Sequence, residues 1–271
     1  MDAFQAIVLG IVQGLTEFLP ISSSGHLRIV PAFAGWEDPG AAFTAVIQLG
    51  TMAAVLLYFR HDLLNIARGW FAGLRDPAVR GTLDSRMGWY LIIGTIPIVV
   101  FGFAFDDQIE EDLRSLNLIA GTLIGLGLLL LLAEGVAKRD RDVEHVTWRD
   151  SLIIGFAQAA ALIPGVSRSG ATITAGLFLG FDRAAAARFS FLLSVPAVVL
   201  SGLYQLRDIG GEGAVGAVPT TLATIAAFVS GYAAIAFLLK FLATHTTAVF
   251  VVYRVGLGVL VFALVGANVI D

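Results

Sequence analysis

Six uninterrupted apolar segments constrain this chain more than any other feature of its sequence. A membrane-spanning helix needs roughly 20 predominantly apolar residues, and each segment is about that long. They lie at 41–59, 88–105, 117–133, 185–206, 217–240 and 247–268, and the first three contain no charged side chain. Arg188, Lys240 and Arg254 lie toward the ends of the other three, where a long cationic side chain can reach the membrane surface. The sequence therefore predicts an all-α polytopic membrane protein with six transmembrane helices.

The composition agrees with this class and excludes others. Of 271 residues, 57% are hydrophobic and 14% are charged, whereas soluble domains carry about 25% charged residues. The net charge is −4 and no basic patch is present, so nucleic acid is not an expected partner. The absence of cysteine excludes disulfides, thiolate metal sites and a cysteine nucleophile. Residues 1–4 lack the basic start of a secretory signal, so we expect the first apolar segment to be retained.

Two further apolar segments, 3–35 and 151–181, are each interrupted in the middle by Pro, Ser and Gly. The interruptions lie at 19–26 and 163–170, and each remaining half is too short to span a bilayer. We therefore predict two re-entrant helical hairpins. Non-helical backbone at membrane depth is tolerated only where it is buried in protein or lines a wet cavity, so both breaks should lie inside the protein.

The distribution of cations predicts the orientation. Cytoplasmic loops of membrane proteins carry an excess of Lys and Arg. Two predicted loops, 60–87 and 134–150, hold most of them: Arg60, Arg68, Arg75, Arg80, Arg86, Lys138, Arg139, Arg141 and Arg149. The acidic loop between them, 106–116, has Arg114 as its one cation. We expect the first two loops in the cytoplasm and the acidic loop and both termini outside. The first hairpin would then enter from outside and the second from the cytoplasm.

An internal repeat relates the two breaks. A shift of 145 residues aligns them without a gap and pairs identical residues: Gly10 with Gly155, Gln13 with Gln158, Ser22 with Ser167, Ser24 with Ser169 and Gly25 with Gly170. Each half contains one hairpin and three spans, and an odd number of spans gives the halves opposite orientations. We predict one membrane domain with inverted-topology repeats 1–134 and 151–271, joined by a cytoplasmic loop at 135–150. Such folds place their sites where broken helices meet near the midplane.

Ionisable residues in and beside the breaks are candidates for chemistry. A charge near the bilayer centre costs about 2.5–3.5 kcal/mol. We therefore expect Glu17, His26 and Arg168 each to have a polar partner and a functional role. Gln13 and Glu17 are four residues apart and share a helix face. His26 follows Glu17 by nine residues across a turn, so we expect the two to pair. The structural alternative is a packing salt bridge between Glu17 and Arg168, although buried pairs are poor stabilisers.

The two turns, 22–25 and 167–170, are suited to phosphate. Their backbone N–H groups and hydroxyls lead into helices, whose N-termini attract anions, and Arg168 could bind a phosphate bidentately. His26 could be a nucleophile or a proton donor. The structural alternative is that the small residues only allow close helix packing. Arg254 either closes the pocket or snorkels, and Gln48 either bonds between helices or supports the pocket.

These residues resemble a known family. The segment 13–26, Gln-Gly-Leu-Thr-Glu-Phe-Leu-Pro-Ile-Ser-Ser-Ser-Gly-His, resembles its first motif, and 164–172 resembles its second, Pro-Gly-x-Ser-Arg-Ser-x-x-Thr. The family is undecaprenyl-diphosphate phosphatase of the bacitracin-resistance type, and the likeness covers nearly the whole chain. It implies a divalent-metal-dependent phosphatase at the outer face of the plasma membrane. Its substrate would be a polyprenyl diphosphate, and its role would be to recycle the lipid carrier of cell-wall glycan synthesis.

The resemblance also implies roles for residues. Glu17, Ser23, His26 and Arg168 become the catalytic candidates, with either Ser23 or His26 as the nucleophile. The predicted substrate-binding residues are Gln13, Ser22, Ser24, Gly25, Ser167, Ser169, Gly170 and Thr172. Mg²⁺ or Ca²⁺ is the expected cofactor, with Glu17 as its main ligand. Gln at position 13, where the motif also permits Glu, leaves Glu17 as the sole carboxylate there. A homodimer is left open.

A secondary transporter or lipid flippase is the competing hypothesis, because broken helices in inverted repeats are typical of transporters. A transporter site needs ligands for its substrate and coupling ion but no nucleophile. Phosphoryl transfer needs a nucleophile, a proton-transfer group and charge stabilisation, which Glu, Ser, His and Arg supply together. A purely structural scaffold would leave Glu17 and Arg168 unexplained.

Overall fold

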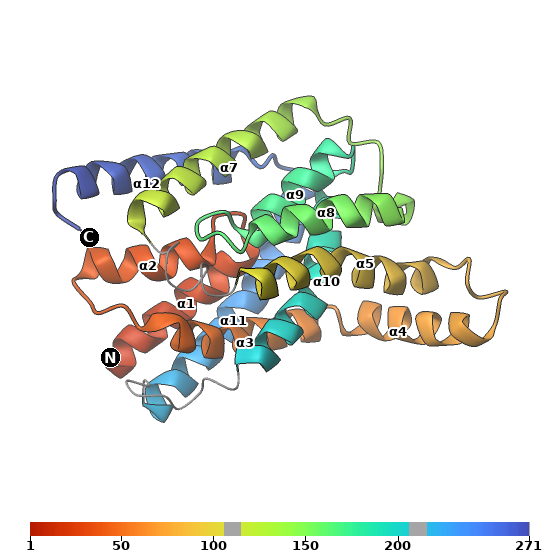
Figure 1. Cartoon of the computed structure of the whole chain (residues 1–271), viewed down its shortest axis with the longest axis horizontal. Coiled ribbons are helices and arrows are strands. Elements are labelled where there is room, and N and C mark those ends of the chain that lie inside the picture. The colour runs from red at the N-terminus through yellow and green to blue at the C-terminus, as the bar shows by residue number, and fades with distance from the viewer. Residues whose placement is uncertain (106–114, 206–215, 271) are drawn as a thin grey trace.

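The structure is a computed structural model that describes residues 1–105, 115–205 and 216–270 (Figure 1). Within these ranges the long elements are all α-helices, which confirms the predicted all-α class. In chain order they are α1 (Ala3–Phe18), α2 (Ser23–Ala34), α3 (Gly40–Tyr58), α4 (Arg60–Arg75), α5 (Leu83–Ala104), α7 (Leu116–Val136), α8 (Trp148–Ala160), α9 (Arg168–Phe178), α10 (Arg183–Gln205), α11 (Ala217–Leu242) and α12 (Ala248–Gly266), with a short 3₁₀ turn η1 (Val143–His145) before α8.

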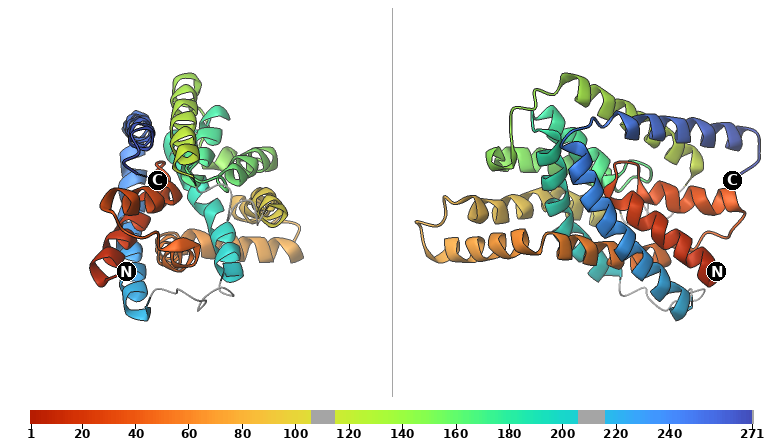
Figure 2. Two further views of the ribbon diagram at one scale, coloured as in Figure 1. Left: turned by 60° about the vertical axis from the view of Figure 1, so that its left-hand side comes forward. Right: turned by 180° about the vertical axis from the view of Figure 1, so that it is seen from behind.

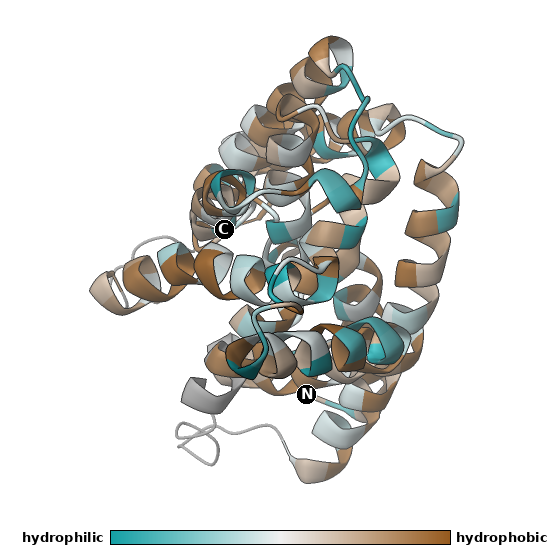
Figure 3. Ribbon diagram, turned by 90° about the vertical axis from the view of Figure 1, so that its right-hand side faces the viewer, coloured by the Kyte–Doolittle hydropathy of each residue, from teal (hydrophilic) through white to brown (hydrophobic). Residues whose placement is uncertain are grey.

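Helices with the length and apolar character of membrane spans coincide with the predicted segments. Among the described residues, five helices qualify singly, namely α5, α7, α10, α11 and α12, and the bent pair α3–α4 would make a sixth. Large apolar side chains face outward; Val252, for example, is 73% exposed, and hydrophobic residues predominate along the outer helices (Figure 3). Buried positions include many polar residues. Such helices are those of a multi-pass membrane protein.

The prediction of a loop at 60–87 is wrong over most of its length. Helix α4 occupies Arg60–Arg75, at 73° to α3, and α5 already begins at Leu83. The reason is an apolar face at helical spacing among the arginines, which packs on α5. Ile66 and Gly73 are buried on this face, and α4 and α5 lie side by side in Figure 1. The predicted acidic loop lies mostly outside the described residues.

The two breaks separate α1 from α2 and α8 from α9, as the sequence predicts. Their local geometry is the same. Ser22 and Ser167 each precede a helix with positive φ, 77° and 73°, a conformation that is unusual for residues other than glycine. The hydroxyl of each accepts the backbone N–H three residues on, from Gly25 and Gly170 at 3.3 and 3.1 Å. Each serine therefore caps the helix that follows it.

The first helix of each pair also begins in the same way. Asp2 caps α1 and Thr147 caps α8, and each cap is a reciprocal capping box, completed by Gln5 and Asp150. These residues are related by the same shift of 145. The shared caps mean that two parts of the chain with different sequences start and interrupt their helices at matching positions.

The broken helices pack against spans that are distant in sequence. Helix α1 lies along α11, α8 lies along α5, and α7 lies along α12 (Figure 2). Close approach requires glycine at two of these crossings. A Cβ on Gly10 would lie 2.2 Å from the Ala223 carbonyl oxygen, and one on Gly155 would lie 2.4 Å from that of Gly94. This packing holds the first helix of each broken pair against the helical bundle.

Candidate active site

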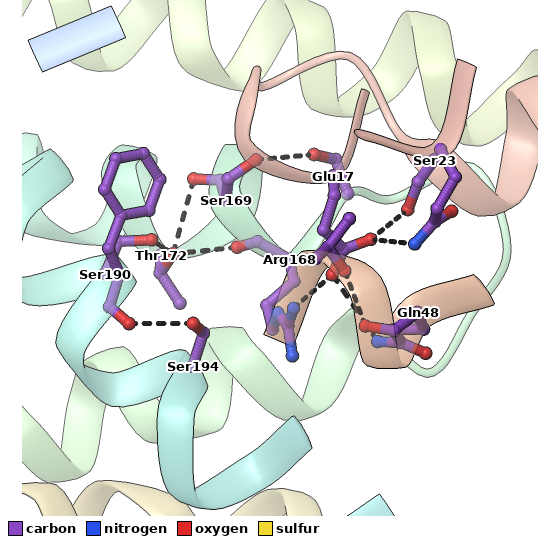
Figure 4. Close-up of polar contacts among 12 residues, drawn as sticks. Glu17, Ser23, Gln48, Arg168, Ser169, Thr172, Ser190 and Ser194 are labelled. Atoms are coloured by element: carbon purple, nitrogen blue, oxygen red, sulfur yellow. Dashed lines mark hydrogen bonds and ion pairs between the residues drawn. The ribbon is translucent and has the colours of Figure 1, made fainter. Parts of the chain in front are cut away.

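Glu17, at the end of α1, is the centre of a polar cluster that joins the two breaks (Figure 4). Its Oε2 accepts the Ser23 hydroxyl at 2.7 Å and the Gln13 amide at 3.1 Å. Its Oε1 accepts the Gln48 amide at 3.5 Å and forms an ion pair with Arg168. Gln13 and Glu17 thus share a helix face as predicted, and Gln48 contacts the cluster. Glu17 is buried, so these bonds are made away from bulk water.

Two further bonds join the breaks, and a third joins the second break to α7. The Ser169 hydroxyl donates to the Leu19 carbonyl at 3.0 Å, and the Gly165 N–H donates to the Ser24 hydroxyl at 3.4 Å. From α7, the Thr122 hydroxyl donates to the Pro164 carbonyl at 2.8 Å. The turn N–H groups and hydroxyls predicted to bind phosphate therefore lie next to one another.

Ser23 is the first residue of α2 and is partly exposed. A carboxylate can only accept a hydrogen bond, so the 2.7 Å contact places the hydroxyl proton between Ser23 and Glu17. The serine lone pairs are then directed elsewhere. A hydroxyl bonded to a carboxylate in this way has the arrangement of a nucleophile beside its general base.

His26 does not pair with Glu17, and that expectation is wrong. Its Nδ1 lies 2.6 Å from the Ser22 carbonyl oxygen, and its Nε2 lies 2.6 Å from the Tyr253 hydroxyl. His26 follows its own cap, Ser22, by four residues in the helical turn, so its ring bonds back to Ser22 and not to Glu17. A carbonyl only accepts, so Nδ1 carries a proton and, in the neutral ring, Nε2 accepts from Tyr253. Both ring nitrogens are therefore in use.

Most of the predicted phosphate ligands hold the breaks in shape. Ser22 and Ser167 cap their helices through the N–H groups of Gly25 and Gly170. Thr172 donates to the Arg168 carbonyl at 2.8 Å, and its oxygen lies 2.6 Å from that of Ser190.

Close packing explains the glycines. A Cβ on Gly170 would lie 2.7 Å from the Arg254 guanidinium. The alternative hypothesis, that the small residues of the turns only allow close helix packing, therefore holds for part of the predicted substrate-binding residues. Ser24, by contrast, is exposed beside the breaks. Ser167, Ser169 and Thr172 are all buried.

Arg254 is fully buried and does not snorkel. Its guanidinium donates to five backbone carbonyls, those of Pro20, Thr122, Leu123, Gly165 and Val166. The sequence left its role open and gave no role to its neighbour Tyr253. An Arg seven residues into an apolar helix was the signal that a buried partner existed, but its partners are backbone atoms that leave no trace in sequence.

The polar cluster supplies only part of the ligands that a hard divalent cation needs. Among the described residues no group of three or more His, Cys, Asp or Glu side chains forms a metal cage. However, the Gln13 Oε1 is buried without a hydrogen-bond partner in the described structure, next to the Glu17 carboxylate. Mg²⁺ is commonly bound through one or two carboxylates together with substrate phosphates. The residues therefore fit an ion that the diphosphate itself would help to coordinate.

Comparison with known proteins places the chain in a family. A family model described as bacitracin resistance protein BacA matches residues 6–260. The chain belongs to the BacA family. A relative from Nocardioides sp. is 55% identical over 271 residues, covering 100% of this chain and 99% of the relative. Relatives from Thermobifida fusca and Chlorobaculum tepidum are each 53% identical, covering 100% and 99% of this chain and 92% and 99% of their own lengths. All three are named undecaprenyl-diphosphatase.

Proposed function

We propose that this chain hydrolyses undecaprenyl diphosphate, or a closely similar polyprenyl diphosphate, to the monophosphate and inorganic phosphate. The observation that carries the proposal is the Ser23 hydroxyl bonded to Glu17, with Arg168 of the other break paired to the same carboxylate. The names of the relatives support the same activity and not transport. The product is the lipid carrier of cell-wall glycan synthesis, so the reaction recycles that carrier.

The diphosphate binds between the breaks and displaces the Arg168 guanidinium from Glu17. Arg168 then binds the terminal phosphoryl oxygens, for which its planar fork is suited. The first N–H groups of α2 and α9 have no acceptor within their helices, and the caps take one in each. The remaining N–H groups bind the same oxygens. Preorganised donors of this kind are often worth about 3–4 kcal/mol each in phosphoryl and acyl transfer.

Ser23 attacks the terminal phosphorus, and Glu17 takes its proton. The bond from that phosphorus to the bridging oxygen breaks, and the lipid monophosphate leaves with a proton passed on from Glu17. A water molecule then attacks the phosphoserine, Glu17 takes a proton from the water, and the Ser23 oxygen regains one as phosphate departs. His26 is the alternative nucleophile. Its Nε2 must first lose the bond to Tyr253.

A divalent cation, Mg²⁺ or Ca²⁺, would be held by Glu17 and the Gln13 carbonyl oxygen together with the diphosphate. When bound, it supplies positive charge that neutralises the phosphate oxygens. Gln13 and Glu17 would orient it, since both lie on one face of α1. Release of Glu17 from Arg168 on substrate binding frees the carboxylate oxygen that such an ion needs.

The architecture that fits this chemistry has six spans and two re-entrant hairpins in inverted repeats 1–134 and 151–271, joined by a cytoplasmic loop at 135–150. The shift of 145 relates Glu17 to Leu162, Ser23 to Arg168 and His26 to Ala171. One break therefore carries the nucleophile and base, and the other carries the cation.

In the proposed orientation the arginine-rich segments lie in the cytoplasm, and the site opens toward the outer face of the plasma membrane. A homodimer would keep a complete site in each copy, because Glu17, Ser23 and Arg168 belong to one chain.

Phosphate release from farnesyl and undecaprenyl diphosphate by detergent-purified protein tests the activity. We expect release by the wild type and by Ser194→Ala, whose hydroxyl bonds within its own helix to Phe191 and to no other described residue. We expect Ser23→Ala to lose at least about a hundredfold, as removal of the group that attacks phosphorus should. The absence of phosphate release by folded wild type would refute the proposal.

A further inference from the structure

Arg254 is the one side chain in the described structure that bonds to the backbone of both breaks and to α7 at once. Its Nη1 donates to the Pro20 carbonyl at 3.2 Å, and its Nη2 donates to those of Gly165 and Val166, each at 3.0 Å. Its Nε donates to the Leu123 carbonyl of α7 at 3.2 Å. One rigid planar group therefore fixes the distance between two turns that lie 145 residues apart in the chain.

The two carbonyls at the ends of the guanidinium are equivalent in the repeat. Pro20 and Gly165 are 145 residues apart, the same shift that relates Ser22 to Ser167. Pro20 lies three residues before Ser23, and Gly165 lies three residues before Arg168. Arg254 thus bonds to matching backbone positions just ahead of the proposed nucleophile and of the proposed phosphate-binding cation.

The chemistry of its partners indicates a purpose beyond packing. Every hydrogen-bond partner of Arg254 among the described residues is a carbonyl oxygen, and its side chain is fully buried. Burial of a charge is expensive unless it is well bonded, and an apolar residue would pack here at lower cost. By contrast, Arg183, which is partly buried, is bonded to the Glu134 carboxylate at the far end of α7.

We propose that Arg254 is a positioning residue for phosphoryl transfer, which sets Ser23 and Glu17 of one break against Arg168 of the other. The inference rests on the proposed phosphatase activity. Arg254 acts through the backbone carbonyls and does not touch the substrate. Lysine cannot replace it, because an ammonium is a compact point charge without the two-ended fork.

The test compares Arg254→Lys with Arg183→Lys. Glu134 lies 11 residues from Leu123 on α7, about 17 Å along the helix, so Arg183→Lys alters a partly buried arginine–carboxylate pair away from the site. We expect Arg254→Lys to lose about a hundredfold in kcat, the loss expected for a misplacement of roughly 1 Å. We expect KM to stay within about threefold, since the groups that bind substrate remain.

Orthovanadate separates positioning from loss of folded protein. A phosphoryl transition-state analogue weakens in proportion to the loss of kcat/KM when positioning is damaged, whereas a smaller folded fraction lowers the apparent kcat without changing the vanadate Ki. We therefore expect the Ki to rise about a hundredfold in Arg254→Lys and to stay unchanged in Arg183→Lys. If Arg254→Lys cannot be purified folded, Arg254→Gln, which removes the buried charge and keeps two N–H donors, carries the same expectations.

Turnover near the wild-type value in either Arg254 variant overturns the inference, and so does a loss of kcat with an unchanged vanadate Ki. Failure of the wild type to hydrolyse farnesyl diphosphate is a different result, because it refutes the proposed function itself.

Discussion

Removal of the Glu17 charge should destabilise the protein through Arg168 as well as abolish catalysis. The two side chains are 7% and 15% exposed and form an ion pair. Removing one partner of a buried pair typically costs about 3–5 kcal/mol, because the other charge is left buried and unpaired. We expect Glu17→Gln to lower the free energy of unfolding by this amount. The double variant Glu17→Gln/Arg168→Gln should be less unstable than the sum of the single variants, with a coupling of roughly 2 kcal/mol.

The assay is denaturation in mixed micelles, followed by the fluorescence of the four tryptophans. Asp62→Asn is the matched control. Its partner Arg188 forms an ion pair in which the side chains are 44% and 33% exposed, and such pairs contribute only about 0–1 kcal/mol. Activity should be lost at least about a hundredfold in all three Glu17 and Arg168 variants, because the base or the phosphate-binding cation is gone. Additive stabilities in the double variant would refute the coupling of the two breaks through this pair.

Three further outcomes are expected. Gly165→Ala should cost at least about 2 kcal/mol of stability, since its φ is +87° and a Cβ would lie 2.0 Å from the Thr122 hydroxyl. Gly125→Ala, with open space around it, should instead gain about 0.5–1 kcal/mol in the same micelle denaturation assay. Excess EDTA should abolish turnover and Mg²⁺ or Ca²⁺ should restore it, so full activity in chelator would contradict the cation. In intact cells, Glu37→Cys should react with a membrane-impermeant thiol reagent and Arg75→Cys should not, and labelling of Arg75→Cys would invert the proposed topology.

The sequence predicts most of the helices and both breaks, because membrane burial leaves a direct compositional trace. Apolar length locates the spans, and Pro, Ser and Gly locate the interruptions. Helix α4 was not predicted because its arginines indicated a loop, although its apolar residues lie on one face of a helix. The sequence repeat pairs the two N-cap residues, Ser22 and Ser167, but it does not predict their positive φ.

Side-chain partners are harder to predict, since they depend on which way a helix faces. The four-residue spacing of Gln13 and Glu17 correctly predicted that they share a helix face. The nine-residue spacing of Glu17 and His26 led to the prediction that they pair, which is wrong. Tyr253 and Arg254 bond to groups more than 80 residues away in sequence, mostly backbone carbonyls. No residue pattern marks a backbone acceptor, so this part of the site required the structure.

The identity of the nucleophile tests the account most directly. Farnesyl diphosphate labelled on its terminal phosphorus is mixed with excess enzyme, quenched within one turnover in acid or in alkali, and digested for mass spectrometry. We predict an acid-stable phosphoryl group on the peptide that contains Ser23, and its absence in Glu17→Gln. A phosphoryl group on His26 that survives only the alkaline quench would contradict the assignment of Ser23 as nucleophile and Glu17 as its base.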